Sequence, residues 1–444
     1  MRPHVFSLSL SLSFSLALGA TLSGQRLYVD AAAATGGDGN SWSTAYQTLA
    51  PALARAGAGT EVWVAQGIYR GGFTVGAGVN LRGGFRSGAT RAEQAQPFAL
   101  RSFLDGGGTQ RVLSLANAAI LDGFVVQNGN APAPGGGGAV VDGGSPTITR
   151  CVFTANRNSG GRGAALYVTN GADPIVRNCL FHANSNSGHT IDVERNARGT
   201  FDHVTVADNP HNGLHMQDGA ACVITNSIFA RNGGRGLCDF SAGAVNRPSL
   251  ANVLFWQNAV SLMHYRGQEF QTVAQVNNLS YAQANVAVDP GFVGGGDYRL
   301  ALGAGAIDRG AGNPGTAPDA FGAPRALDGD LDGASVPDIG FHEFTHAALA
   351  VTGTPTPGNT LTFAVGGGNA LAGALALGTP GGAFPLPPLG VIYGTPLVVL
   401  PLGPLPASLP LLIPTGARGD LVAQAVAVGA SAGTLGNAIE LRIR

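Results

Sequence analysis

The chain has 444 residues, of which 69 are glycine and only 11% are charged. Its formal net charge is −1, and neither sign of charge forms a long run. Binding to nucleic acid or to an anionic membrane usually requires a basic patch, so the composition argues against both partners. The composition does not argue against a glycan as the ligand. Frequent glycine without a collagen period favours an all-β protein that is rich in turns.

Residues 1–24 have the features of a secretory signal peptide. Arg2 provides the positive start, residues 5–18 form an apolar stretch diluted by serine, and small residues follow. A membrane anchor is the alternative, and the short, interrupted apolar run argues against it. We therefore expect an exported protein, secreted or at the cell surface, with no transmembrane segment in the mature chain.

The next segment predicts a cap for one end of a β structure. Leu27–Asp30 is typical of a strand, and Thr48–Arg55 is typical of a short helix that Thr48 can cap. Glu61–Ala65 follows as a further strand. A stack of strands needs such a cover, because an exposed strand edge would pair with other chains. We expect the first strand and the helix to lie across the first coil.

A nine-residue phrase recurs between residues 120 and 258. Each copy ends in asparagine, and the closing asparagines lie 23 to 28 residues apart. A fixed phrase at this period predicts a solenoid whose short units bury their apolar sides against one another. A turn amide can bond its own backbone and the amides of neighbouring units. The sequence predicts a structural asparagine ladder of Asn128, Asn156, Asn184, Asn209, Asn232 and Asn258.

Two kinds of solenoid share this spacing. A leucine-rich repeat would need a helix or similar crossing between the phrases. The chain instead has turn-forming stretches there, such as Gly160–Gly163 and Gly233–Gly236. Short apolar segments, such as Leu166–Val168 and Ile191–Val193, also lie between the phrases. Two or three short strands in each coil indicate a parallel β-helix.

Two end segments carry a resemblance to a known family. Gly36–Trp42 and Gly59–Tyr69 resemble the opening of exported bacterial right-handed parallel β-helix proteins, and Pro337–Glu343 resembles the D-I-G-x-x-E phrase that closes their helix. That family includes pectate-lyase-like enzymes, surface adhesins and proteins of unassigned function, so the resemblance implies a fold more firmly than an activity. It implies a right-handed parallel β-helix over residues 25–344, with an N-terminal capping strand and helix.

The composition changes after Phe344, where asparagine becomes rare and proline frequent. Short apolar stretches separated by proline and glycine predict a small β-sandwich over residues 345–444. Pro385–Gly390 and Leu435–Ile443 resemble C-terminal sandwich modules of exported planctomycete-type bacterial proteins. This resemblance implies an attachment or spacing module without catalytic residues.

Outward side chains of successive coils form rows, and glycan-acting members of the resembled family use such a face. Aligning the apolar segments between the phrases gives an outward row with Tyr167, Asp192 and His215. The predicted ligand-binding residues are Tyr167, Asp192, Glu194, Arg195, His215 and Gln217, and the catalytic candidates are Asp192, Glu194, His215 and Asp218. Paired carboxylates can hydrolyse glycosides, and carboxylates that hold Ca²⁺ near a basic residue suit β-elimination of uronates. The alternative is a solvated face whose charges pair weakly.

A second candidate site is a calcium loop, and Ca²⁺ is the one cofactor that the sequence suggests. Asp328–Gly333 has carboxylates at alternate positions followed by glycine. The glutamate that would complete an EF-hand is replaced by Ile339, for which Asp338 or Glu343 could substitute. The candidate ligands are Asp328, Asp330, Asp332 and Asp338. The alternative is a hydrophilic turn.

Histidine and cysteine give weaker signals. Five of the nine histidines lie between residues 182 and 215, but their spacing fits no compact zinc motif, so we interpret them as turn and surface residues. Cys151 and Cys179 occupy the same place in consecutive phrases. That placement allows a disulfide, but favours two small buried apolar side chains.

These observations lead to three functional hypotheses. The first is an exported or cell-surface β-helix protein that binds glycan or another extracellular surface without catalysis. The second is a polysaccharide lyase or glycoside hydrolase that acts on an acidic glycan. The third is a structural spacer or adhesin stalk. We expect a monomer in each case.

Overall fold

The structure is a computed structural model that describes residues 24–443 with short gaps. Residues 1–23 and residue 444 lie outside the description, so the expected signal peptide is not covered apart from its last residue. The gaps are 187, 241–247, 302, 312–317, 326, 331–333, 346–347, 353–354, 367–371, 387–389, 404–406, 416–418 and 429–432.

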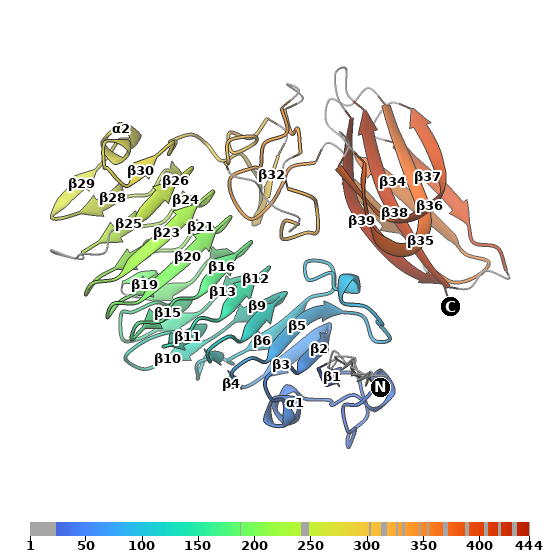
Figure 1. The fold of residues 1–444 in the computed structure, drawn as a ribbon, viewed down its shortest axis with the longest axis horizontal. Helices are drawn as coiled ribbons and strands as arrows, with labels where there is room; N and C mark the ends of the chain where they lie inside the picture. The colour runs from blue at the N-terminus through green and yellow to red at the C-terminus, as the bar shows by residue number, and fades with distance from the viewer. Residues whose placement is uncertain are drawn as a thin grey trace, which may run out of the picture.

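The described chain is all-β, and its larger part is a right-handed parallel β-helix with three long sheets (Figure 1). Sheet A contains β1 (Arg26–Val29), β2 (Glu61–Ala65), β5 (Asn80–Phe85), β8 (Ile120–Asp122), β12 (Thr147–Thr149), β16 (Ile175–Arg177), β20 (Arg198–Asp202), β23 (Ala221–Thr225), β26 (Ser249–Ala251) and β30 (Ala282–Gln283). Sheet B contains β3 (Gly67–Arg70), β6 (Ser102–Asp105), β9 (Phe124–Gln127), β13 (Val152–Thr154), β17 (Leu180–His182), β21 (Thr205–Ala207), β24 (Ile228–Ala230) and β27 (Leu254–Trp256).

Sheet C carries the candidate functional residues. It contains β4 (Phe73–Val75), β7 (Leu113–Leu115), β11 (Ala139–Asp142), β15 (Leu166–Thr169), β19 (His189–Val193), β22 (Asn212–Met216), β25 (Arg235–Asp239), β28 (Ser261–Tyr265) and β29 (Gln268–Phe270). Its strands pair in parallel except β28 and β29, which pair antiparallel. A short sheet of β10 (Asn130–Ala131), β14 (Arg157–Asn158) and β18 (Ser185–Asn186) lies between sheets B and C along the chain.

The two ends of the solenoid are covered differently. At the N-terminal end, β1 extends sheet A beyond β2, and α1 (Leu49–Arg55) packs against β1, β2 and β4. Thr48 is the N-cap residue of α1, but its side chain makes no capping hydrogen bond, contrary to the sequence expectation. At the other end, α2 (Val273–Asn277) follows β29, and its buried Val276 joins the main core.

Inward-facing side chains stack in columns through the core. The register of sheet B aligns Phe153 with Phe181, and their rings lie 4.8 Å apart, nearly parallel. The same register places Phe229 opposite Phe255 two coils further on. These rings are fully buried. The repeat phrase therefore builds the core because its aromatic position faces inward in successive coils.

A column of asparagine amides runs along the turns after sheet B. Each amide nitrogen donates to the next amide oxygen, at 3.0 Å from Asn156 to Asn184 and 2.9 Å from Asn232 to Asn258. Asn209 continues the column between them. The residue before each asparagine has a positive φ, and the amide bonds stabilise that tight turn.

Asn128 is not part of this column, so its assignment to the ladder is wrong. The register pairs Gln127 with Thr154, which places Asn128 beside Ala155 rather than Asn156. Its amide donates instead to Asp105 at 3.0 Å. The ladder position in that coil is Gly129, whose backbone N–H donates to the amide oxygen of Asn156 at 2.9 Å.

The segment of residues 284–344 packs on the outer face of sheet B. It includes the hairpin β31 (Phe292–Gly294) and β32 (Asp297–Leu300). Its apolar residues, such as Ile339 and Phe341, form a second core with outward residues of β17, β21, β24 and β27. The phrase Pro337–Glu343 therefore lies against the side of the solenoid and does not close its end as expected. The N–H of Gly340 donates to the carbonyl of Asn226 on the sheet A to sheet B turn.

Two antiparallel sheets follow, compatible with the expected β-sandwich. One contains β33 (Ala348–Thr352), β34 (Thr360–Gly366) and β37 (Ala407–Leu412). The other contains β36 (Gly390–Gly403), β35 (Ala372–Leu386), β38 (Gly419–Val428) and β39 (Gly433–Ile443), in that order. Within the described residues, no helix is both long and apolar enough to cross a membrane.

Candidate functional site

The outer face of sheet C presents one continuous row of side chains. Its register pairs Tyr167 with Asp192, Asp192 with His215, and His215 with Cys238. The predicted row is thus assembled on β15, β19 and β22. The next member on β28 is His264, because Met263 points into the core.

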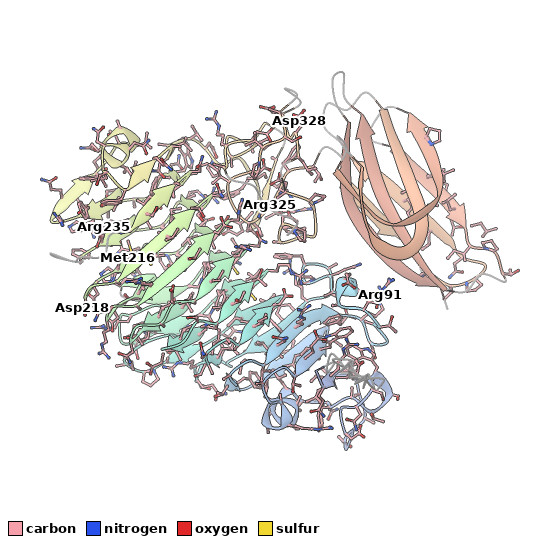
Figure 2. The ribbon with its side chains drawn as sticks, in the orientation of Figure 1. Arg91, Met216, Asp218, Arg235, Arg325 and Asp328 are labelled. Atoms are coloured by element: carbon pink, nitrogen blue, oxygen red, sulfur yellow. The ribbon has the colours of Figure 1, made fainter. Side chains whose placement is uncertain are left out.

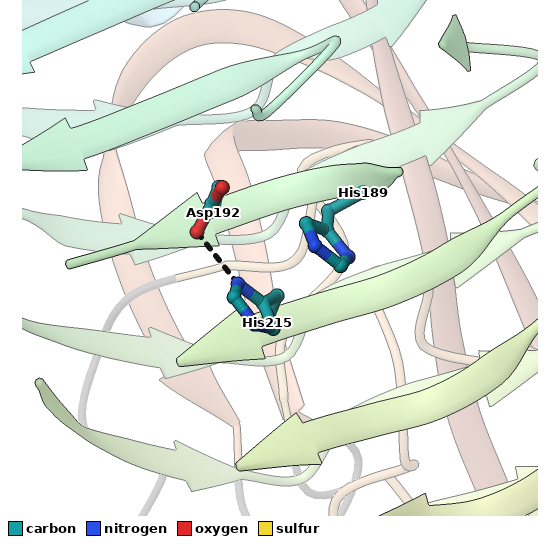
Figure 3. A group of neighbouring side chains, drawn as sticks. All are labelled: His189, Asp192 and His215. Carbon is teal, nitrogen blue, oxygen red and sulfur yellow. Dashed lines mark hydrogen bonds and ion pairs between the residues drawn. The ribbon is translucent and has the colours of Figure 1, made fainter. Parts of the chain in front are cut away.

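Asp192 and His215 form a hydrogen-bonded pair below the surface (Figure 3). Nδ1 of His215 lies 2.9 Å from Oδ1 of Asp192. The carboxylate is fully buried, and its second oxygen, Oδ2, has no hydrogen-bond partner among the described residues. Such a pair fixes the tautomer of the imidazole, with Nδ1–H donating to the carboxylate.

His189 completes this cluster from the start of β19. Its ring stacks on that of His215, with centroids 3.8 Å apart and planes within 4°. The amide nitrogen of Asn212 lies 3.2 Å from its Nδ1. Burial, and then the neighbouring His215, lower the pKa of His189 to about 4, so its ring is neutral at pH 7.

Glu194 is the centre of a second cluster, next to the first. Its buried carboxylate accepts hydrogen bonds from the Tyr167 hydroxyl and from Nε2 of Gln217, the latter at 2.7 Å. Arg162 and Arg195 both form ion pairs with it, the second at 3.4 Å. Both carboxylate oxygens are therefore engaged, so the side chain of Glu194 is held in place by its neighbours.

The four catalytic candidates do not form one site. Asp192 and His215 lie in the first cluster and Glu194 in the second. Asp218 is exposed in the turn after β22, where its φ is positive (Figure 2). The carbonyl of Asp218 accepts from the N–H of Asn196, so its backbone holds the turn.

A trough of about 440 Å³ with mixed polar and apolar lining lies beside the second cluster, since Tyr167 and Arg195 belong to both. It lies over β4, β7, β11 and β15, and Tyr167, Thr169 and Arg195 line its end nearest β19. The other lining residues are Thr74, Arg111, Ser114, Leu115, Ala116, Pro134, Val140, Asp142 and Asn170. Arg111 donates to the carbonyls of Gly135 and Gly136, and burial lowers its pKa. The trough thus combines two guanidinium groups with hydroxyl and amide groups.

The candidate calcium loop forms a different group from the one predicted. Asp328 and Asp330 lie with Asp308, each offering a carboxylate oxygen within 4.8 Å of the others. Asp338 is buried apart from them, and it accepts hydrogen bonds from the backbone N–H groups of Asp308 and Phe344. Burial raises the pKa of Asp308 to about 7. Asp332, the remaining candidate, lies outside the described residues.

All four cysteines are buried, and none of them forms a disulfide in the described chain. Cys151 and Cys179 face the core of the solenoid, while Cys238 lies in the outward row of sheet C. Burial raises the pKa of the Cys238 thiol to about 12. Buried protonated thiols act as small apolar side chains.

Sequence reasoning missed four residues around the site. Arg162 lies in a glycine-rich stretch that was interpreted only as a turn, although a single arginine among glycines is a recognisable signal. Arg111 and Asp142 lie on coils whose apolar segments were not aligned with the others. His189 is one of the clustered histidines, but the alignment does not assign it to the row, because it lies three positions before the row residue Asp192.

The comparison with protein families agrees with the fold of the solenoid. Residues 109–260 match the sequence profile of a family described as "Right handed beta helix region". Among solved structures, the chain resembles the crystal structure of pectate lyase Pel9A at a TM-score of 0.43 and 16% sequence identity, covering 73% of this chain and 98% of that one. The comparison with curated proteins gives no match.

Proposed function

We propose that this chain is an exported protein that binds an acidic glycan along the trough on sheet C, without catalysis. The observation that carries the proposal is the placement of Arg111 and Arg195 among hydroxyl and amide side chains in one trough of about 440 Å³. Guanidinium groups recognise carboxylates, and polar side chains recognise sugar hydroxyls. On this proposal the C-terminal sheets serve for attachment or spacing.

The accessibility of the carboxylates argues for binding over cleavage. A glycosidase acid must reach the glycosidic oxygen, and the second carboxylate must reach water or the sugar carbon. Asp192 and Glu194 are both fully buried, and Glu194 is held by four side chains. Arg195, in contrast, is exposed and lines the trough. The exposed Asp142 also lines the trough, where its Oδ1 accepts from the amide of Asn170, but it is the one carboxylate in that lining and so lacks the partner that glycoside hydrolysis needs.

The decisive experiment incubates the mature protein with a panel of polyuronates and neutral glycans, with and without Ca²⁺. It follows both retention on the polymer and release of new chain ends. We expect retention on polyuronates without new ends. New ends that require Asp192 or His215 would overturn the proposal. The absence of both retention and new ends would also contradict it and would favour a structural spacer.

A matched pair of variants tests the site itself. Arg195→Ala should weaken polyuronate binding about tenfold, the effect of one charge-assisted hydrogen bond of about 1.4 kcal/mol. Arg198→Ala removes an exposed arginine from sheet A and should leave affinity unchanged. Equal losses from both variants would indicate non-specific charge attraction and contradict a site in the trough.

One observation favours a polysaccharide lyase as a second candidate. The buried Asp192 carboxylate orients the His215 imidazole, and an oriented imidazole is a general base. For this candidate, His215→Ala should abolish the formation of unsaturated chain ends in protein that keeps the wild-type circular dichroism, although the loss of a partner for the buried Asp192 lowers the melting temperature. The two candidates separate in that assay, because a binding protein forms no such ends before or after the substitution.

A further inference from the structure

We propose that His189, Asp192 and His215 form a binding site for a divalent transition-metal ion of the zinc class on the outer face of sheet C. The proposal does not rest on glycan binding. It concerns a group that the sequence did not bring together, since the histidine spacing fits no compact motif.

The geometry of the three side chains supports the site (Figure 3). Each offers one donor atom, and the three donors lie within 4.8 Å of one another. Donors that share one Zn²⁺ at about 2.0–2.1 Å lie roughly 3.3 Å apart in a tetrahedron. The two rings are stacked with their planes within 4°, so ring rotation is needed to turn both donors toward one ion. The backbone is already fixed, because β19 and β22 pair in register from His189 to Val193.

An independent observation is the unsatisfied carboxylate oxygen. Asp192 is fully buried, yet its Oδ2 has no hydrogen-bond partner among the residues that the structure describes. A buried carboxylate oxygen without a donor is costly, so native proteins nearly always provide one. A cation held between this carboxylate and the two imidazoles would supply the missing partner.

The donor set decides which class of ion fits. Ca²⁺ and Mg²⁺ prefer oxygen ligands, whereas two imidazoles and one carboxylate suit zinc and neighbouring transition metals. Three protein ligands leave a fourth position open. Phe240 packs against His215, with ring centroids 5.3 Å apart, and provides an apolar neighbour of the site.

The position of the site relates it to the trough. Asp192 pairs in register with Tyr167, which lines the trough. An ion at Asp192 would therefore lie one strand beyond the end of the trough. Its open coordination position is available to water or to an oxygen ligand.

The test uses the metal-stripped mature protein and the metals alone. Titration with Zn²⁺ by calorimetry, and with Co²⁺ by visible absorption, should show one equivalent bound by the wild type. His189→Ala and Asp192→Asn should each weaken this binding at least tenfold. His211→Ala, which removes a partly exposed turn histidine outside the cluster, should bind as the wild type does.

A folding control keeps the result interpretable. Each variant is first shown to keep the wild-type circular dichroism, and His189→Ala is the safer variant because His189 is only partly buried. Zn²⁺ should raise the melting temperature of the wild type and of His211→Ala, but not that of Asp192→Asn. Full binding by folded His189→Ala, equal loss in His211→Ala, or displacement of the bound Zn²⁺ by an equal concentration of Ca²⁺ would each overturn the proposal.

Discussion

The side-chain amide of Asn184 donates to Oδ1 of Asn209 on the next coil, 3.2 Å away. The same nitrogen also lies 2.9 Å from the carbonyl oxygens of Phe153 and His182. Asn184 is almost fully buried, so water cannot replace these partners. One side chain thus connects three successive coils.

Replacing Asn184 by alanine should lower the free energy of unfolding by about 1–3 kcal/mol, because buried carbonyl and N–H groups lose their partners. Urea denaturation measures this change. Asn80→Ala is the control, since Asn80 is a partly exposed residue of β5 outside the column. A loss in Asn184→Ala no larger than in the control would contradict a stabilising role of the column.

The repeat phrase made much of the solenoid predictable. From residue 148 onward the spacing between its apolar positions and its asparagine is constant, so the strand pairs and the inward Phe153 and Phe181 follow from it. Tyr167, Asp192 and His215 follow the phrase asparagines by 11, 8 and 6 residues (167−156, 192−184, 215−209), so their row was predictable only from the apolar segments around them.

The register of the first copy was not predictable in this way. Leu121, rather than Ile120, pairs with Ile148, so the alignment of that copy was shifted by one residue. The true ladder position is Gly129, which contributes only a backbone N–H. A glycine leaves no side-chain signal, and the neighbouring Asn128 offered a misleading one.

The site and the segment after the solenoid depended on contacts that no periodicity encodes. His189 lies 26 residues before His215, but the coil between Asp192 and His215 has 23 residues, so the stacking of the two rings comes from the direction of the side chains. The phrase Pro337–Glu343 indicated an ordered segment. It did not indicate which surface of the solenoid that segment covers.

The internal packing of that segment depends on a buried ion pair, whose Arg325 also donates to Oδ1 of Asn178 on the solenoid at 2.6 Å. Glu343 pairs with Arg325 at 3.3 Å and accepts hydrogen bonds from the N–H groups of Leu327 and Asp338. Burial raises the pKa of Glu343 to about 7. Glu343→Ala should lower the free energy of unfolding by about 3–5 kcal/mol, because it leaves the buried Arg325 without a counter-charge.

Glu343→Gln is the matched comparison for this prediction. The glutamine keeps an oxygen that can accept from the backbone, so its loss should be smaller. Urea denaturation gives both values, and limited proteolysis should cut residues 284–344 faster in Glu343→Ala. Equal stability of the two variants would show that the bonds from the backbone matter little, and wild-type stability of both would contradict the role of the ion pair.

The four buried thiols give a test of the cysteine assignment. Because all four are almost fully buried, they should not react with a thiol reagent in the native protein. In denaturant, and without any reductant, all four should react. Titration of fewer thiols in denaturant would indicate a disulfide and contradict the packing of Cys151 and Cys179 as separate apolar side chains.

The acidic group of Asp308, Asp328 and Asp330 leads to a prediction about pH and to a test of Ca²⁺ binding. Burial raises the pKa of Asp308 to about 7 in the folded protein, whereas an unfolded aspartate has a pKa of about 3.9. The folded state therefore binds more protons than the unfolded state between about pH 4 and pH 7. The destabilisation from this carboxylate is absent below pH 4, grows as the pH rises, and is complete above pH 7.

Asp308→Asn removes this titration and should stabilise the protein in a calcium-free buffer. We expect a gain of about 1–2 kcal/mol at pH 8, after allowance for solvent screening of a half-buried group, and almost none at pH 4. The asparagine oxygen can still accept the N–H of Asp330, which lies 2.7 Å from Oδ2 of Asp308. Thermal unfolding at the two pH values measures the difference, with the exposed Asp173→Asn as a control expected to show no change.

If the three carboxylates hold Ca²⁺, the ion will raise the melting temperature of the wild type at pH 8 and have little effect on Asp308→Asn. An equal response of both proteins to Ca²⁺ would exclude this group as the calcium site, and a loss of stability in Asp308→Asn at pH 8 would contradict the raised pKa.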